Sequence, residues 1–251
     1  MDLGIRGRTA LVLGAGGGLG RAIARALSAE GVRVALGDID SAAVEETARV
    51  LRQEGGKALP LTWDLGDLAQ IGPNVERIEA ELGPIDILVN NTGGPKPSTV
   101  SGQDAALWQQ SFQTMVLSVI ALTDSVLPGM RERKWGRIVN IGSINGQAGQ
   151  YGQVNYAAAK SGIHGFTKAL AQEGARVGVT VNAIAPGYIA TNNTAALQAD
   201  ETRNRQIQER IPAGRWGAPS DIGGAAVFLS SPAANYIHGH VLAVDGGWLA
   251  R

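Results

Sequence analysis

Short apolar runs alternate along this chain with longer segments in which apolar residues recur at helical spacing. Most of the runs are apolar at successive positions rather than at every second one, which is typical of strands buried on both faces of a parallel sheet. The predicted strands cover residues 9–13, 32–36, 58–61, 85–89, 137–141, 179–184 and 241–244. The segments between them have a helical pattern and several end at Gly, as in 20–31, 41–56 and 155–175.

Strands that alternate with helices predict right-handed βαβ crossovers and an α/β fold, a doubly wound sheet with helices on both faces. The 251 residues, of which 44% are hydrophobic, suffice for one buried core, so residues 1–251 are expected to form a single domain. Two stretches fit neither helix nor strand. The segment 93–98 is rich in Gly and Pro, and the polar segment 188–215 is interpreted as a lid over the substrate.

Composition removes several classes of protein. The 22 basic and 22 acidic residues cancel, so neither nucleic acid nor an anionic membrane surface is an expected partner. The chain has no Cys, which rules out disulfides, thiolate zinc sites and a cysteine nucleophile, and we expect no metal site. The first residues lack the features of a signal peptide and no apolar run reaches about 18 residues, so we expect a cytoplasmic protein without membrane spans.

The first chemical motif directly follows the first predicted strand, in the sequence TALVLGAGGGLGRAIARAL. It places Gly14, Gly18 and Gly20 at the turn from strand to helix. Glycines there allow the backbone to approach a pyrophosphate closely, and the start of the helix supplies free N–H groups and a partial positive charge. A tight strand-to-helix corner without a ligand is the alternative interpretation of the same glycines.

Asp38 lies at the end of the second predicted strand, 18 residues beyond Gly20. An acidic residue about 20 residues after the glycines is the type that binds the ribose diol of a dinucleotide. A carboxylate accepts hydrogen bonds from a 2′-hydroxyl but repels a 2′-phosphate, and Ala15, Gly16 and Ile39 supply no positive charge. NAD(H) is therefore favoured as the cofactor, with NADP(H) as the alternative. The other interpretation of Asp38 is a cap of the following helix.

A serine, two tyrosines and a lysine lie close together after the fifth predicted strand. Tyr156 and Lys160 are four residues apart in a helical pattern, so both lie on one helix face. The ammonium is expected to lower the tyrosine pKa from about 10, which prepares the phenol for acid–base chemistry. Ser143 ends the strand at the carboxyl edge of the sheet, where it could hold a substrate oxygen, and Tyr151 is assigned to the pocket wall. An amphipathic helix face is the alternative interpretation of the Tyr and Lys pair.

The motifs GAGGGLG, TWDLGD, NNTGG, YAAAK and NAIAPGYIAT, together with Asp38 and Ser143, resemble those of the short-chain dehydrogenase/reductase family over essentially the whole chain. The resemblance implies a Rossmann fold with a seven-stranded parallel sheet, a homotetramer, and hydride transfer between a nicotinamide cofactor and a small-molecule carbonyl or alcohol. It assigns Tyr156 as the proton donor and Ser143 as the residue that positions the substrate oxygen. Lys160 would tune the tyrosine and bind the nicotinamide ribose.

The resemblance also implies a set of cofactor contacts, in which residues 90–93 line the cofactor, Asp64 approaches the adenine and 186–191 hold the nicotinamide carboxamide. The implied cofactor-binding residues are Gly14, Gly16, Gly17, Gly18, Leu19, Gly20, Asp38, Ile39, Asp64, Leu65, Asn91, Thr92, Gly93, Tyr156, Lys160, Pro186, Gly187, Ile189 and Thr191.

Two positions depart from the family pattern. Leu13 stands where a threonine usually precedes the first glycine, which removes one local hydrogen bond. Met115 stands where the family frequently has an asparagine that holds a water relaying protons to the lysine. A thioether cannot donate a hydrogen bond, so the relay is either rerouted through another group or slow. We expect reduced but measurable activity.

Different segments resemble different branches of the family. The portion through Gly142 resembles ketoacyl-reductase-like members, and NGQAGQYGQVNYAAAKSGIHGFTKALAQE resembles acetoacetyl-CoA reductases. The segments APGYIATNNTAAL, RIPAGRWGAPSD and VDGGWLAR resemble 2-deoxy-D-gluconate 3-dehydrogenases. The favoured reaction is reduction of a 3-oxoacyl (β-keto) thioester or related carbonyl. The alternatives are a sugar-acid 3-dehydrogenase and an NAD-binding protein with little or no turnover.

The expected substrate contacts are Asn145, Gln150, Gln153 and Tyr188. A thioester carrier would bring phosphates, which the basic residues near the strand that leads to Ser143 could bind. The alternative interpretation of these residues is a solvated helix end, where cations are favoured. A sugar acid would instead require a cation in the lid, and His164 is expected to serve packing or an interface. The candidate cations are Arg131, Arg133, Lys134 and Arg137 for phosphates, and Arg203, Arg205, Arg210 and Arg215 for a sugar acid.

Overall fold

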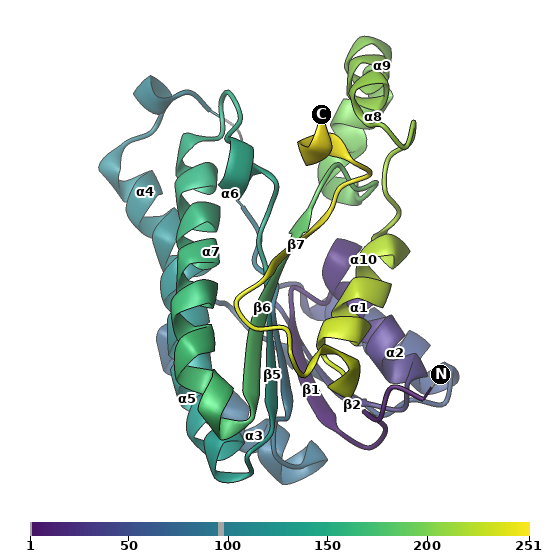
Figure 1. The fold of residues 1–251 in the computed structure, drawn as a ribbon, viewed down its shortest axis with the longest axis vertical. Coiled ribbons are helices and arrows are strands. Elements are labelled where there is room, and N and C mark those ends of the chain that lie inside the picture. The colour runs from purple at the N-terminus through teal and green to yellow at the C-terminus, as the bar shows by residue number, and fades with distance from the viewer. Residues whose placement is uncertain (1, 95–97) are drawn as a thin grey trace.

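The computed structural model describes residues 2–94 and 98–251 and contains a seven-stranded, wholly parallel sheet (Figure 1). The strand order is β3-β2-β1-β4-β5-β6-β7, which confirms the predicted α/β fold. The strands are β1 (Thr9–Leu13), β2 (Arg33–Asp38), β3 (Ala58–Thr62), β4 (Ile87–Asn90), β5 (Gly136–Ile141), β6 (Val179–Pro186) and β7 (Val241–Val244). Of the irregular segment 93–98, residues 95–97 lie outside the described residues.

All seven predicted strands form, and their ends differ from prediction by at most two residues. Strand β2 continues to Asp38 because this residue pairs with Thr62 of β3, and β6 continues to Pro186 because it pairs with Val244 of β7. Continuous burial holds for the inner strands β1, β4, β5 and β6. The edge strands β3 and β7 are partly exposed, since each has a neighbour on one side only.

Helices cover both faces of the sheet (Figure 1). On one face, α1 (Gly18–Ala29), α2 (Ser41–Gln53) and α10 (Pro219–Leu229) enclose an apolar core with the inward side chains of β1 and β2. On the other face, α3 (Ile71–Leu82), α5 (Ser118–Glu132) and α7 (Val154–Gly174) enclose the second core. The remaining helices are α4 (Ala105–Phe112), α6 (Asn145–Ala148), α8 (Ala195–Ala199) and α9 (Glu201–Arg210).

A turn of π-helix, Gln113–Leu117, joins α4 to α5 into one long helical run. Such π-turns are rare and occur often at functional sites. In the described part of the chain, the run Ala105–Glu132 is the one helix long and apolar enough to cross a membrane by length and composition. One side of this helix packs into the core through Leu122, Val126 and Met130. Packing against the sheet therefore accounts for the apolar character of these residues.

The chain reverses direction across the sheet between β1 and β4, since β2 and β3 extend to one side and β5 to β7 to the other. In open α/β sheets, ligands bind outside the carboxyl ends of the strands at such a reversal. The loops that follow β1, β2, β4, β5 and β6 all begin at this edge. They carry the glycine turn, Asn91, Ser143 and Gly187, and Asp38 is the last residue of β2 at the same edge.

Candidate active site

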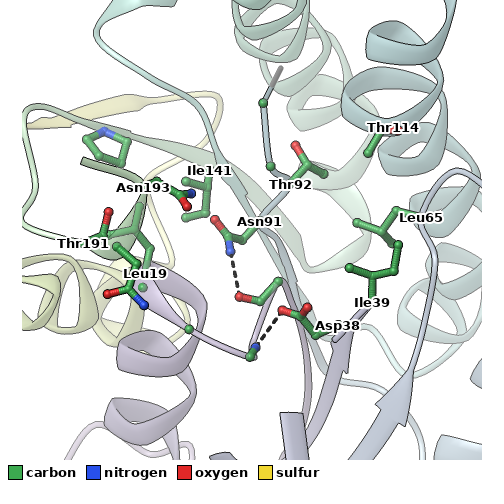
Figure 2. Close-up of a pocket in the computed structure, with 18 of the residues that line it drawn as sticks. Leu19, Asp38, Ile39, Leu65, Asn91, Thr92, Thr114, Ile141, Thr191 and Asn193 are labelled. Carbon is green, nitrogen blue, oxygen red and sulfur yellow. Dashed lines mark hydrogen bonds between the residues drawn. The ribbon is translucent and has the colours of Figure 1, made fainter. Parts of the chain in front are cut away.

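A cavity of about 670 Å³ lies at this edge of the sheet, a size typical of small-molecule sites. It extends from the glycine turn and Asp38 to Ser143, Tyr156 and Lys160. Figure 2 shows side chains from several strand ends pointing into the space. The structure therefore brings the dinucleotide motif and the Ser, Tyr and Lys residues to one site.

The glycine turn is held by side chains at the ends of β2 and β4, the two strands that flank β1 (Figure 2). The Gly16 N–H donates to Asp38 Oδ2 at 2.7 Å. The Asn91 amide donates to the carbonyls of Leu13 and Gly14 at 3.1 and 3.3 Å. Leu13 lacks the side-chain hydrogen bond that a threonine would make in the turn, but the Asn91 amide binds the turn from the end of β4. Sequence spacing alone did not indicate this contact.

Asp38 does not cap α2. The cap is Asp40, whose carboxylate accepts from the Ala43 N–H at 3.0 Å. Asp38 is the last residue of β2 and lies against Gly16, so closely that a Cβ on this glycine would stand 2.8 Å from the carboxylate. A carboxylate has about four lone-pair positions, so Asp38 can hold the turn and still accept from a ribose hydroxyl.

Nearly all of the predicted cofactor-binding residues line the cavity. Gly20 is the exception, since it is buried beneath the turn. Asn90 also lies away from the cavity, because its amide donates to Asn140 inside the sheet at 2.8 Å. The predicted residues along the cavity wall are Gly14, Gly16, Gly17, Gly18, Leu19, Asp38, Ile39, Asp64, Leu65, Asn91, Thr92, Gly93, Tyr156, Lys160, Pro186, Gly187, Ile189 and Thr191. This wall fits a dinucleotide.

Ser143 lies two residues beyond the end of β5 rather than at the end of the strand. Its hydroxyl accepts from the Asn145 N–H at 3.1 Å. Tyr156 and Lys160 come from the first two turns of α7, as their spacing predicted. Lys160 is only 1% exposed, and its Nζ lies 5.6 Å from the centroid of the Tyr156 ring.

Burial controls the acid–base properties of this pair. It raises the pKa of Tyr156, and a hydrogen bond with Ser143 acts in the opposite direction. The expectation that Lys160 lowers the tyrosine pKa is therefore wrong for the chain without a cofactor, because removing a phenolate from water outweighs the nearby groups. Burial also lowers the pKa of Lys160 to about 8.

Lys160→Met provides a stability test of this burial. An unfolded lysine titrates at about 10.5 and the folded Lys160 at about 8, so the unfolded chain binds more protons between these values. The free energy of unfolding of the wild type should therefore rise relative to the Met variant as the pH goes from 7 to 10.5, by on the order of 3 kcal/mol. Urea unfolding at both pH values measures it. A difference that does not change with pH would contradict the lowered pKa.

The predicted substrate residues lie beside the cavity rather than along its wall. The Asn145 amide donates to Gln150 at 2.9 Å, and the Gln150 amide donates to the Tyr188 hydroxyl at 3.0 Å. Gln153 pairs its backbone with Ser98. Tyr151 is 91% exposed, so its assignment to the pocket wall is wrong. The Gly residues around it carry the loop outward, with positive φ at 149 and 152.

The cations proposed for phosphate binding lie at the opposite edge of the sheet. Arg137 is the second residue of β5 and stacks on Trp135, and burial lowers its pKa to about 10. Arg131 pairs with Glu173, and Arg133 donates to the Ile85 carbonyl at 2.8 Å. A strand of six residues is about 20 Å long. These arginines therefore support the helix end and the sheet and do not face the cavity.

The segment 188–215, predicted from the sequence to be a lid, contains α8 and α9. Ile207 of α9 and Ile211, which directly follows α9, pack against Trp216. Two of the segment's candidate cations have other partners, since Arg210 stacks on Trp248 at 4.0 Å and Arg215 pairs with Asp221. None of Arg203, Arg205, Arg210 and Arg215 lines the cavity. In residues 2–94 and 98–251, no group of three or more acidic or His side chains is placed to hold a metal ion.

The cavity wall includes residues that sequence reasoning missed. Gly94 packs so closely on Tyr156 that a Cβ there would stand 2.7 Å from the ring. Thr114, in the π-turn, lines the cavity, whereas its neighbour Met115 is buried and does not. The turn Asn192–Thr194, within the segment 188–215, also lines the cavity. The second Gly of NNTGG was the signal that could have identified Gly94.

The comparisons with known proteins agree with this geometry. Residues 14–249 match the family model described as enoyl-(acyl carrier protein) reductase. The chain is 44% identical over 240 residues to an acetoacetyl-CoA reductase of Shinella zoogloeoides, covering 96% of this chain and 98% of that protein. It is 41% identical over 247 residues to a 2-dehydro-3-deoxy-D-gluconate 5-dehydrogenase of Bacillus subtilis, covering 98% and 96%.

A solved structure from Beutenbergia cavernae is similar along its entire length. That protein is provisionally assigned as an NAD(P)-dependent gluconate 5-dehydrogenase and has NADP bound at low occupancy. It is 42% identical, with a TM-score of 0.95 and full coverage of both chains. Together with the sheet order and the cavity, these matches show that the chain belongs to the short-chain dehydrogenase/reductase family of NAD(P)-dependent oxidoreductases.

Proposed function

We propose that this protein uses NADH to reduce the ketone of a 3-oxoacyl thioester or a related β-keto carbonyl compound. The observation that carries the substrate class is the charge of the cavity. Among the described residues that line it, Lys160 is the one cation, and its Nζ donates to Thr92 and to the Ile141 carbonyl. A substrate carboxylate is usually bound by Arg or Lys, so this cavity favours an uncharged carbonyl group.

The chain's own residues supply the acid–base half of the reaction. Ser143, which follows β5, and Tyr156, in the first turn of α7, both line the cavity, and their side chains are hydrogen-bonded. In the proposed mechanism Ser143 holds the carbonyl oxygen and Tyr156 donates a proton to it as negative charge develops. Lys160 lies beneath the tyrosine ring and stabilises the phenolate that remains. The bound nicotinamide would supply the hydride.

A sugar-acid dehydrogenase is the second candidate function. The chain Asn145–Gln150–Tyr188 offers amide and phenol groups next to Ser143 that could bind sugar hydroxyls. The Bacillus subtilis relative is named for such an activity.

One assay separates the candidates. The protein is mixed with NADH or NADPH and with acetoacetyl-CoA, a simple β-ketoester or a keto sugar acid, and the loss of absorbance at the nicotinamide band is followed. The proposal expects the β-keto compounds to have the higher kcat/KM. A preference for the sugar acid would favour the second candidate. Cofactor binding without turnover of any compound would indicate a nicotinamide-binding protein.

Asp38→Asn tests the proposed preference for NADH. The amide oxygen keeps an acceptor for Gly16, while the charge that repels a 2′-phosphate is removed. The kcat/KM for NADPH relative to NADH should rise by about 10-fold, equivalent to about 1.4 kcal/mol. Steady-state kinetics with both cofactors measures the ratio. Asp104→Asn, at the cap of α4, is the matched control and should not change it. A wild type that already works better with NADPH would refute the proposal.

We also propose a cytoplasmic homotetramer without nucleic acid or membrane partners. The balanced charge and the absence of Cys are consistent with this setting. Leu117 and Ile120 remain 46% and 40% exposed on the long helix. Adjacent exposed apolar side chains of this kind are suited to contact between subunits.

A further inference from the structure

Lys160 is a buried cation with two fixed hydrogen-bond partners. Its Nζ donates to the Ile141 carbonyl at 2.8 Å and to Thr92 Oγ1 at 3.3 Å. The carbonyl belongs to the last residue of β5 and can only accept. Thr92 follows β4, and its hydroxyl can accept from Lys160 and at the same time donate to a group in the cavity.

The difference between these two hydrogen-bond partners matters because a proton donor must be reprotonated in every catalytic cycle. When Tyr156 gives its proton to the substrate oxygen, a phenolate remains, and the ammonium of Lys160 is the nearby acid that can replace the proton. The amine left on Lys160 must then take a proton from solvent. Both residues line the cavity, but Lys160 is only 1% exposed and Thr92 is 9% exposed, so the Thr92 hydroxyl is the more open of the two to the cavity water.

We propose that the Thr92 hydroxyl positions Lys160 and is the group through which this lysine exchanges its proton with the water of the cavity. In this exchange the Thr92 O–H gives its proton to the Lys160 amine and receives one from a cavity water. One proton passes from solvent to Tyr156 overall, and no group changes its oxidation state. The inference rests on the proposed carbonyl reduction.

The structure also shows why neighbouring groups do not fill this role. Met115 is buried and does not line the cavity, so it offers no polar atom there. Thr114 and Thr92 both line the cavity (Figure 2), but the hydrogen bond from Lys160 goes to Thr92. Because Met115 stands where the family frequently has an asparagine, the proton relay to Lys160 was expected to run through another group or to be slow. Thr92 is a specific candidate for that group.

The charged and titratable groups around Lys160 are few among the described residues. Tyr156 and His164 lie one turn away on either side along α7, and His164 is buried with its Nε2 unpaired. Asp38, Asp40 and Asp64 line the other end of the cavity. Because Thr92 does not titrate, a change in the pH profile on its replacement reports on Lys160 and Tyr156.

Thr92→Val removes the hydroxyl and keeps the branched shape, whereas Thr92→Ser restores a hydroxyl. We expect kcat for the Val variant to fall roughly 10-fold, a part of the 10²–10⁴-fold that proton transfer contributes, with little change in KM for NADH. The Ser variant should recover most of the rate. The pH profile of the Val variant should shift to lower pH, because the ammonium loses an acceptor that favours its charged form. Thr180→Val is the control for losing a buried hydroxyl, because Thr180 lies at the start of β6, away from the cavity. Its kcat and pH profile should equal those of the wild type.

A second readout does not depend on turnover. In the cofactor-free protein, an NMR titration of the Lys160 side chain should give a pKa below the wild-type value in Thr92→Val and close to it in Thr92→Ser. Thr92→Ala replaces the Val variant if that protein does not fold. Wild-type kcat and pH profile in a folded variant without the hydroxyl would overturn the proposal, and so would a Ser variant as slow as Val. If the wild type turns over none of the carbonyl compounds, the proposed function fails, while the titration still decides the role of Thr92.

Discussion

Tyr156→Phe is expected to lower kcat by about 10²–10⁴-fold, the range that general acid catalysis contributes. The ring packs against Gly94, where there is no room for a Cβ, and Phe keeps that packing. The fold should therefore be retained, and the affinity for NADH should change little because the remaining wall of the cavity is intact. Steady-state kinetics and a fluorescence titration with NADH measure the two effects separately.

Tyr151→Phe is the matched control for this substitution. It removes a phenol hydroxyl five residues away in the loop before α7, where the side chain is 91% exposed. We expect its kcat to equal that of the wild type. If the Tyr156 variant kept the wild-type rate, another group would be the proton donor, and the proposed reaction would lose its acid.

The arrangement of strands and helices could be predicted because buried parallel strands require long apolar runs, and this chain has seven of them. The positions of Tyr156 and Lys160 followed from helical spacing alone. The order of the motifs along the chain then placed Asp38 and Ser143 at one edge of the sheet, since parallel strands all end there. Local periodicity and topology thus determine most of the cavity wall.

Other features depend on contacts between segments that are distant in the sequence. The pKa of Tyr156 depends on burial, which spacing does not show, and the predicted direction was wrong for this reason. The arginines near residue 133 and those in the segment 188–215 looked equally available in the sequence. Their partners, such as Glu173, Asp221 and Trp248, became visible only in three dimensions. The same holds for Thr92, whose contact with Lys160 spans 68 residues.

Gly20→Ala is expected to lower the free energy of unfolding by about 4 kcal/mol or more, in the range of exceptional single substitutions. A Cβ at this position would stand 2.0 Å from the Gly14 carbonyl oxygen and 3.0 Å from the Ala15 Cα. Both are backbone atoms, so the glycine turn itself must move away from α1. The corresponding drop in Tm is roughly 10 °C for a chain of this size, and differential scanning calorimetry measures it.

The same displacement should weaken NADH binding, because the turn is the part of the chain that approaches the pyrophosphate. Gly224→Ala is the control, since Gly224 lies in α10, the helix packed on α1, and a Cβ there meets nothing within 4 Å. That variant should gain about 0.5–1 kcal/mol from helix propensity and bind NADH as the wild type does. A Gly20 variant with wild-type Tm and NADH affinity would show that the turn and α1 can separate without cost. The close contact between helix and strand would then not be what shapes the cofactor site.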